Sequence, residues 1–363
     1  MDLEFDPFNS DASLPEQREL FRDCFPEACG SSVESTGHYR WKFHSIRNEP
    51  PSYEYSVWRS NPRKLLGYYA ALPFRYSVGG STFSCGMVCD VMTHSAARGK
   101  GIFTKIGRYA TEDLRSKGID FTSGYPIRPE VIPGHLKVGW EVAQELPLYL
   151  KVLRSNALLK SSIARYFTGI VNVGLRLFAL LTRSRVSGSG QARVDIESAA
   201  DFLNRQDDRY ERFFSRWSAL RKVHLIKDRA FLRWRLGAPE SEYHVIAVVR
   251  GTDIDGMAIV RVTELKGVPC LAVLDLMLVE EDGQASRDLI GAMESFALSR
   301  SCETIGMMIR SDRARRASLL WRGFVRTPFT FKLIIKLLSE RAKEARLLDP
   351  SMFDVMWIDS DDL

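Results

Sequence analysis

The stretch Arg98-Gly99-Lys100-Gly101-Ile102-Phe103 follows a strand-like segment and opens a helix-like one. Apolar residues recur every four positions from Ile102 to Leu114, which predicts an amphipathic helix that stops at Gly118. A glycine turn before a helix offers backbone N–H groups and the positive end of the helix dipole, so it suits a phosphate group. The stretch lacks the ending of a nucleotide-hydrolase P-loop and the third glycine of a dinucleotide fingerprint. An ordinary glycine turn that caps a helix is the alternative.

The segments around this stretch alternate in the manner of a mixed α/β fold. A hairpin turn is expected at residues 78–81 and a short helix over 131–137. Residues 146–153 are expected to close the sheet of this part of the chain. The expected strands cover residues 53–58, 64–76, 83–93, 119–124 and 146–153.

The motif Arg98-x-x-Gly101-x-Phe103 resembles the signature Arg/Gln-x-x-Gly-x-Gly/Ala of the GNAT family of acyl-CoA-dependent N-acyltransferases. The run from Asp90 to His94 precedes it, and Lys137-Val138-Gly139-Trp140 follows about forty residues later, as in that family. The resemblance covers residues 39–153, and a degenerate copy covers 231–338. Phe103 departs from the family pattern, which has a small residue there.

The resemblance implies an acyl-CoA site. Acetyl-CoA or another acyl-CoA is the expected co-substrate, with an acyl-carrier thioester as the alternative donor, and no metal is expected. The backbones of Val91 and Thr93 are expected to hold pantetheine beside a bulged strand and to polarise the thioester carbonyl. The side chain of Arg98 adds charge or stays solvated, as does that of Lys100. The amides expected to bind the pyrophosphate are those of Gly99, Lys100, Gly101, Ile102 and Phe103.

Acyl transfer to an amine needs a proton donor for the departing thiolate and a route for the proton of the amine. The family often has a tyrosine four residues before the Gly-Trp turn, and here that position is His135. We therefore expect His135 as the donor, with a helix-surface histidine as the alternative. Asp90 is the candidate base, with a structural role as its alternative. Weaker candidates near the expected cleft are His94, Tyr125 and Glu130.

The two halves of the chain carry the same landmarks in the same order. Trp41-Lys42 corresponds to Trp234-Arg235, and the distance from Asp90 to Gly139 is 49 residues, against 48 from Asp275 to Gly323. We expect two tandem GNAT-like domains, each a mixed, mostly antiparallel sheet flanked by helices. The expected boundaries are 1–153 for a catalytic domain, 154–193 for a basic apolar linker and 194–363 for a degenerate domain.

The degenerate domain has an acidic run, residues 280–282, at the position of the glycine loop, and Leu319 at the position of His135. Carboxylates would repel a pyrophosphate. The second domain is therefore expected to be structural or to help bind the acceptor.

Composition bounds the function further. The chain has 363 residues and a net charge of +6, but residues 151–193 alone carry eight basic and no acidic side chains, which leaves −2 elsewhere. A protein-wide footprint for nucleic acid is therefore absent. Six cysteines without metal-site spacing, and a start without signal-peptide features, predict a cytoplasmic protein. For the apolar segment 160–185 we expect a helix between the domains or peripheral contact with a membrane.

The expected activity is transfer of an acyl group to a small-molecule amine. A nucleotide-linked amino sugar for surface polysaccharide is the expected acceptor, because two-copy relatives of this kind resemble enzymes of that class. Another small amine is the first alternative, and a non-catalytic CoA-binding or membrane-surface scaffold is the second. A homodimer is compatible with the sequence.

Overall fold

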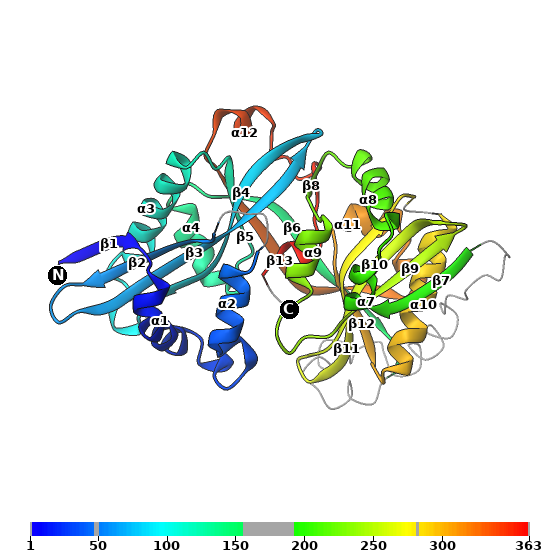
Figure 1. Cartoon of the computed structure of the whole chain (residues 1–363), viewed down its shortest axis with the longest axis horizontal. Coiled ribbons are helices and arrows are strands. Elements are labelled where there is room, and N and C mark those ends of the chain that lie inside the picture. Colours follow the sequence, from blue (N-terminus) through cyan, green and yellow to red (C-terminus); the bar gives the residue numbers. More distant parts are fainter. Residues whose placement is uncertain (1, 47–50, 155–191, 281–282, 362–363) are drawn as a thin grey trace.

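The computed structural model describes residues 2–46, 51–154, 192–280 and 283–361. The apolar segment 160–185 and the joint at 187–190 lie outside these residues. Figure 1 shows two halves side by side. The first half, residues 2–154, contains β1 (Leu3–Pro7), α1 (Ser10–Cys24), α2 (Thr36–His44), β2 (Tyr53–Arg59), β3 (Lys64–Val78), β4 (Ser81–Thr93), α3 (Ile102–Ser116), β5 (Phe121–Gly124), α4 (Ile132–Leu136) and β6 (Glu141–Val152).

The second half, residues 192–361, repeats this order of elements from its strand β9 onward and then adds a C-terminal segment. The predicted strands and helices around the glycine loop are present at nearly the expected bounds. The elements of the second half are β7 (Ala192–Ser198), α7 (Ala199–Asn204), α8 (Arg209–Ala219), β8 (Val223–Leu225), α9 (Arg229–Arg235), β9 (Tyr243–Arg250), β10 (Asp253–Leu265), β11 (Val268–Leu278), α10 (Gln284–Ser299), β12 (Thr304–Met308), α11 (Ser311–Arg316), β13 (Phe324–Leu337), α12 (Glu340–Glu344), β14 (Phe353–Asp354) and the 3-10 turn η7 (Trp357–Asp359).

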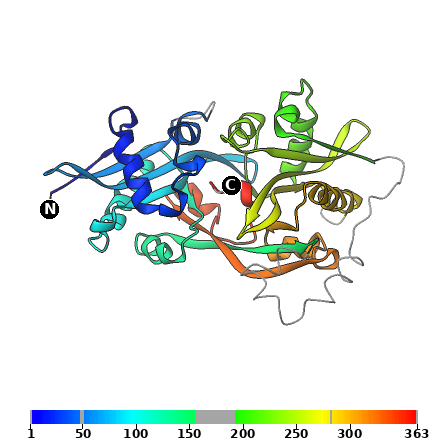
Figure 2. The same ribbon diagram turned by 90° about the horizontal axis from the view of Figure 1, so that it is seen from below.

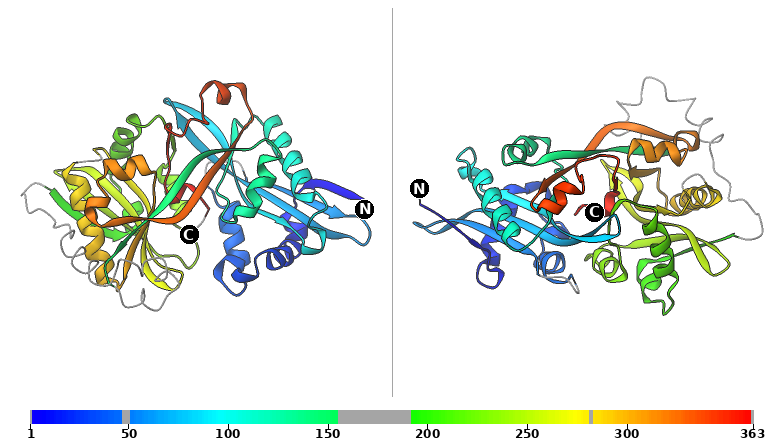
Figure 3. Two further views of the ribbon diagram at one scale, coloured as in Figure 1. Left: turned by 180° about the vertical axis from the view of Figure 1, so that it is seen from behind. Right: turned by 90° about the horizontal axis from the view of Figure 1, so that it is seen from above.

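The strands join into one sheet that runs through both halves, in the order β1-β2-β3-β4-β5-β13-β6-β12-β11-β10-β9-β7. The expectation that residues 146–153 close the first sheet is wrong. Strand β5 pairs instead with the end of β13, from Ile334 to Leu337, while β6 pairs with β12. Figure 3 shows β6 and β13 crossing together between the halves. Each half therefore completes its sheet with a strand from the other.

Helices cover both faces of the sheet. Side chains of β3 point alternately to the two faces, so Tyr69 joins the core beneath α3, whereas Tyr68 joins the core beneath α1. In the second half α10 and α8 occupy the corresponding positions, with Ile246 beneath α10 and Ala247 in the core of α8. No helix in the described residues is long and apolar enough to cross a membrane.

Two tryptophans mark the contact between the halves. The rings of Trp41 on α2 and Trp234 on α9 stack with centroids 5.5 Å apart and an angle of 14° between their planes. The indole N–H of Trp41 donates to the carbonyl oxygen of Trp234 at 2.7 Å, and that of Trp234 donates to the carbonyl of Trp41 at 3.0 Å. Such a reciprocal contact is what a local twofold relation between two similar units produces. The landmark found in the sequence thus lies on the boundary between the halves.

Trp234→Ala should lower the free energy of unfolding by about 3 kcal/mol, because it removes a buried indole. The double variant with Trp41→Ala should show a coupling energy of about 1 kcal/mol, since the two rings contact each other. Urea unfolding measures both quantities. Trp321→Ala is the matched control, because that ring is 83% exposed and its loss should change stability by less than about 0.5 kcal/mol. Additive effects of Trp41 and Trp234 would contradict the interface role.

Candidate functional site

A cavity of about 860 Å³ lies at the end of β4, between the glycine loop and helices α1 and α2. The segment after β5 and helix α4 form another wall. The second half contributes Ala238, Ser241, Arg261, Ile334 and Asp361. A cavity of this size falls in the range of small-molecule and cofactor sites. The predicted site residues can be placed relative to it.

The glycine loop has the conformation that exposes backbone amides. Gly99 has φ +75° and Gly101 has φ +74°, in the left-handed region that favours glycine. Gly101 caps the N-terminus of α3 without a side-chain hydrogen bond. Among the described residues, no group accepts from the first-turn N–H groups of Ile102 and Phe103. These donors lie in the cavity wall and suit an anion.

Phe103 turns its ring away from the loop and onto α4. A Cβ atom on Gly134 would lie 2.7 Å from the ring of Phe103, so any larger residue there would have to displace this ring. The ring of Phe103 also meets that of His135 edge-on, with centroids 4.9 Å apart. Phe103, which replaces the small residue of the family pattern, therefore packs against α4.

The two basic side chains of the loop lie differently relative to the cavity. Arg98 lines the cavity, and its Nε donates to the carbonyl of Thr93 at 3.4 Å. The ammonium of Lys100 donates to the carbonyl of Ala96 at 3.1 Å, and the residue is not part of the cavity wall.

Beyond Val88, strand β4 has one free edge. Its parallel pairing with β5 ends at Val88 and Gly124, and the register with β3 shifts opposite Asp90 and Val91. This bulge and open edge form the splay between two strands that the resemblance implies. Val91 and Thr93 both line the cavity, although the carbonyl of Thr93 already accepts from Arg98 and from the thiol of Cys24.

His135 lies in the cavity wall but is buried between two rings. Its imidazole packs edge-on against Phe103 and against Trp140, with centroids 5.0 Å apart in the second pair. Burial lowers the pKa of His135 from 6.5 to about 4. At neutral pH His135 is therefore an uncharged imidazole. It can donate a hydrogen bond, but it is not an imidazolium that could act as a general acid. The position of His135 at the site was predictable from the sequence, but its lowered pKa was not.

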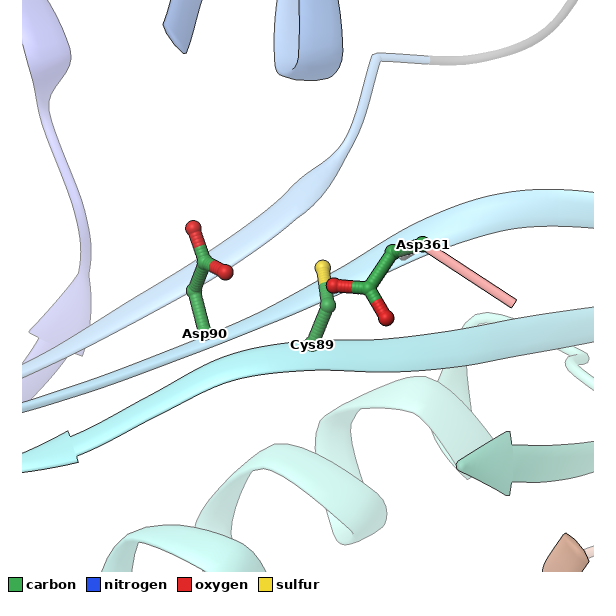
Figure 4. A group of neighbouring side chains, drawn as sticks. All are labelled: Cys89, Asp90 and Asp361. Atoms are coloured by element: carbon green, nitrogen blue, oxygen red, sulfur yellow. The ribbon is translucent and has the colours of Figure 1, made fainter. Parts of the chain in front are cut away.

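Asp90 lies at the bulge with φ +46° and forms an ion pair with Lys42 of α2, at 2.9 Å. The ammonium of Lys42 also bonds Asp361, at 2.8 Å. Figure 4 shows Cys89 and Asp90 rising from β4 on the same side, where neighbours in a regular strand would point to opposite faces. Burial acts against the charge on Lys42, but Asp361 and Asp90 raise its pKa well above the usual value. A cation thus already sits between these carboxylates.

Neither Lys42 nor Asp361 was predicted from the sequence as a site residue. Lys42 was visible only as part of the Trp-Lys landmark, and Asp361 is 319 residues from Lys42 in the chain. Of the weaker candidates, Tyr125 and Glu130 line the cavity, whereas His94 does not. The Nδ1 atom of His94 accepts from the amide of Ala96 at 3.1 Å. Residues 281–282 of the acidic run lie outside the described residues, and Leu319 is fully buried.

Part of the chain matches a known protein family. Residues 9–143 match the family model described as acetyltransferase (GNAT) domain. No curated protein sequence matches the chain.

Solved structures share the fold over most of the chain. The GCN5-related N-acetyltransferase of Anabaena variabilis has a TM-score of 0.66 at 11% identity, over 93% of this chain and 73% of that one. The corresponding protein of Kribbella flavida has a TM-score of 0.61 at 14% identity, over 94% and 72%. The N-myristoyltransferase of Saccharomyces cerevisiae with bound myristoyl-CoA has a TM-score of 0.60 at 11% identity, over 92% and 79%. The expected α/β fold with a large, mostly antiparallel sheet is confirmed.

Gly101→Ala should weaken acyl-CoA binding about tenfold, because an L-residue in the left-handed region costs about 1–2 kcal/mol and displaces the loop amides. Isothermal titration with acetyl-CoA measures the affinity. The control is Gly267→Ala, a hairpin glycine with φ +77° and open space around its Cβ position. It should lose similar stability and keep its affinity. Equal affinity in both variants would contradict a ligand role for the loop.

The low pKa of His135 has a measurable consequence. The unfolded chain, with a histidine pKa near 6.5, binds this proton well before the folded chain does, so His135 lowers stability as the pH falls below 6.5. Lowering the pH from 7 to 5.5 reduces the contribution of His135 to the free energy of unfolding by roughly 1 kcal/mol. The variant His135→Gln lacks this imidazole, so its free energy of unfolding should depend less steeply on pH than that of the wild-type protein.

The comparison must be with the wild-type protein over the same range, because burial raises the pKa of Asp359 to about 7 and that group acts in the opposite direction. Urea unfolding at the two pH values gives the difference. An identical pH dependence in variant and wild type would show that His135 is not buried as described.

Proposed function

We propose that this chain is an N-acyltransferase that moves an acyl group from acyl-CoA to a primary amine. The observation that carries the proposal is the continuity of one cavity, from the free amides at the start of α3, along the open edge of β4, to the carboxylate of Asp90. Along the cavity lie, in this order, a site for an anion, a strand edge that can pair with an extended ligand, and a proton acceptor. The GNAT match over residues 9–143 supports the same activity.

The residues along the cavity have distinct parts in this reaction. The amides of the loop hold the pyrophosphate, and the free edge at Val91 lies beside pantetheine. The amine nitrogen attacks the thioester carbonyl, and Asp90 accepts the amine proton directly or through water. Collapse of the tetrahedral intermediate breaks the C–S bond and releases thiolate, which takes a proton. His135 donates a hydrogen bond to the thiolate as a neutral imidazole. An amine that enters as an ammonium loses two protons, one to Asp90 and one that reaches the sulfur through water.

The finer assignment extends the same proposal. A nucleotide-linked amino sugar is the proposed acceptor, with another small amine as the alternative. Ala238, Ser241 and Arg261 in the cavity wall support a role of the second half, residues 194–363, in binding the acceptor. The repeated order of elements supports a tandem origin of the two halves. Since a similar fold is known with bound myristoyl-CoA, the donor panel includes both acetyl-CoA and myristoyl-CoA.

Purified protein should release CoA thiol from one of these donors when it is given the correct amine. The panel contains nucleotide-linked amino sugars, amino acids and polyamines, and thiol release is followed with a chromogenic disulfide reagent. Asp90→Asn should lower kcat at least 100-fold with little change in CoA affinity, because the amine proton then loses its acceptor.

Binding of CoA without thiol release for any amine would favour the scaffold alternative over an enzyme. Full turnover of His135→Ala across the pH range would remove His135 from the mechanism. A strong preference for a polyamine or an amino acid would replace the amino-sugar assignment and leave the reaction class intact.

A further inference from the structure

The cavity ends at a cluster formed by Lys42, Asp90 and Asp361, which belong to α2, β4 and the C-terminal segment. Lys42 uses Oδ1 of Asp90 and Oδ2 of Asp361. Within the described chain no donor reaches the other oxygen of either carboxylate, and neither oxygen is sealed from solvent. The cluster therefore offers two free acceptors at the cavity wall.

All three side chains line the cavity, and the two carboxylates are the more exposed. The side chain of Lys42 is 9% exposed, that of Asp90 is 14% and that of Asp361 is 20%. One ammonium pairs directly with two carboxylates, so the direct pairing leaves one negative charge without a partner.

Among the described residues, no charged group other than Lys42 forms an ion pair with Asp90 or Asp361. Arg18 of α1 acts on Asp90 only through its charge, since its hydrogen bonds go to Gln17 and to the carbonyls of Val33 and Glu34. Burial lowers the pKa of His38 to about 4, which makes it neutral. Tyr68 donates to Glu54, and burial raises the pKa of the Cys89 thiol well above its usual value.

Contacts between the C-terminal segment and the rest of the second half hold Asp361 in place. Arg235 of α9 donates to the carbonyls of Ile358 and Ser360, at 3.4 and 3.2 Å. Two residues before Asp361, Asp359 lies 3.7 Å from the buried ammonium of Lys227. Figures 1 and 2 both show the last described part of the chain, in red, between the two halves. A segment fixed in this way presents its carboxylate with little freedom, as a recognition group should.

We infer that Asp361 and Asp90 together bind the acceptor as a cationic primary ammonium, with Asp361 as its counter-ion and Lys42 as the fixed cation that holds both carboxylates. This rests on the proposed function and names its acceptor class. An aliphatic amine arrives protonated at neutral pH, because its pKa is near 10. Asp90 takes one proton before attack, and the second proton passes from the nitrogen of the tetrahedral intermediate through water to the departing thiolate. Asp361 keeps the nitrogen near the thioester. A neutral acceptor, such as an alcohol, gains nothing from this pair.

The first test needs no variant and no turnover. Butylammonium and butan-1-ol have the same carbon chain and differ in charge, so ligand-observed NMR compares their binding to the wild-type protein in the presence of CoA. Butylammonium should bind at least tenfold more tightly than the alcohol. Equal binding of the two probes would overturn the inference, whether or not the protein is an acyltransferase.

The second test uses Asp361→Asn with the best amine of the panel. KM for the amine should rise about 10- to 100-fold, while acyl-CoA affinity stays the same and kcat changes less than KM. Asp361→Glu should recover part of the loss. The matched control is Glu344→Gln, which removes an exposed carboxylate of α12 away from the cavity.

The outcomes separate the two proposals. An unchanged KM in a folded Asp361→Asn protein overturns the ammonium site and leaves the proposed function standing. Tight butylammonium binding without thiol release for any amine overturns the proposed function and keeps the cation site. If Asp361→Asn fails to fold, the comparison of the two butyl probes on the wild-type protein decides.

Discussion

The exchange of β6 and β13 between the halves is the constraint on which the rest of the structure depends. Strand β5 has four residues, and on one side it pairs with β4 only as far as Val88. Its other edge is covered by Ile334–Leu337 of β13, which arrives from the second half. Without that strand the first sheet would end at a short edge beside the cavity. Ile334 itself lines the cavity, so the segment of β13 that completes the first sheet also forms part of the cavity wall.

Local sequence pattern was sufficient for the elements of the first half and for the loop. Glycines that need positive φ, followed by apolar residues at helical spacing, specify the turn and α3 without help from distant residues. Strand partners are a different matter. The pairing of β5 with β13 joins residues more than 200 positions apart, and the apolar pattern of a strand does not name its partner. The swap was therefore not readable from periodicity.

The site shows the same division. Spacing from the Gly-Trp turn led to His135, but its low pKa comes from the rings of Phe103 and Trp140, which meet only after folding. Phe103 looked like a defect of the motif and is a packing residue for α4. Asp361 gave no signal at all, because an aspartate near the end of a chain becomes meaningful only when Lys42 is placed beside it.

The protein contains a second lysine held by two aspartates, and the comparison bears on the role of the first. Lys227, Asp275 and Asp359 are at most 1% exposed, and burial raises the pKa of Asp359 to about 7. A fully buried ion cluster is costly to desolvate and is weak as a source of stability. It fixes the C-terminal segment in the second half. Lys42, Asp90 and Asp361 repeat the same chemistry two residues further along that segment, but there the carboxylates open onto a cavity. The buried cluster has no carboxylate oxygen that a ligand could reach, whereas the open cluster presents its carboxylates to the cavity, so the open cluster is the one that can bind a ligand.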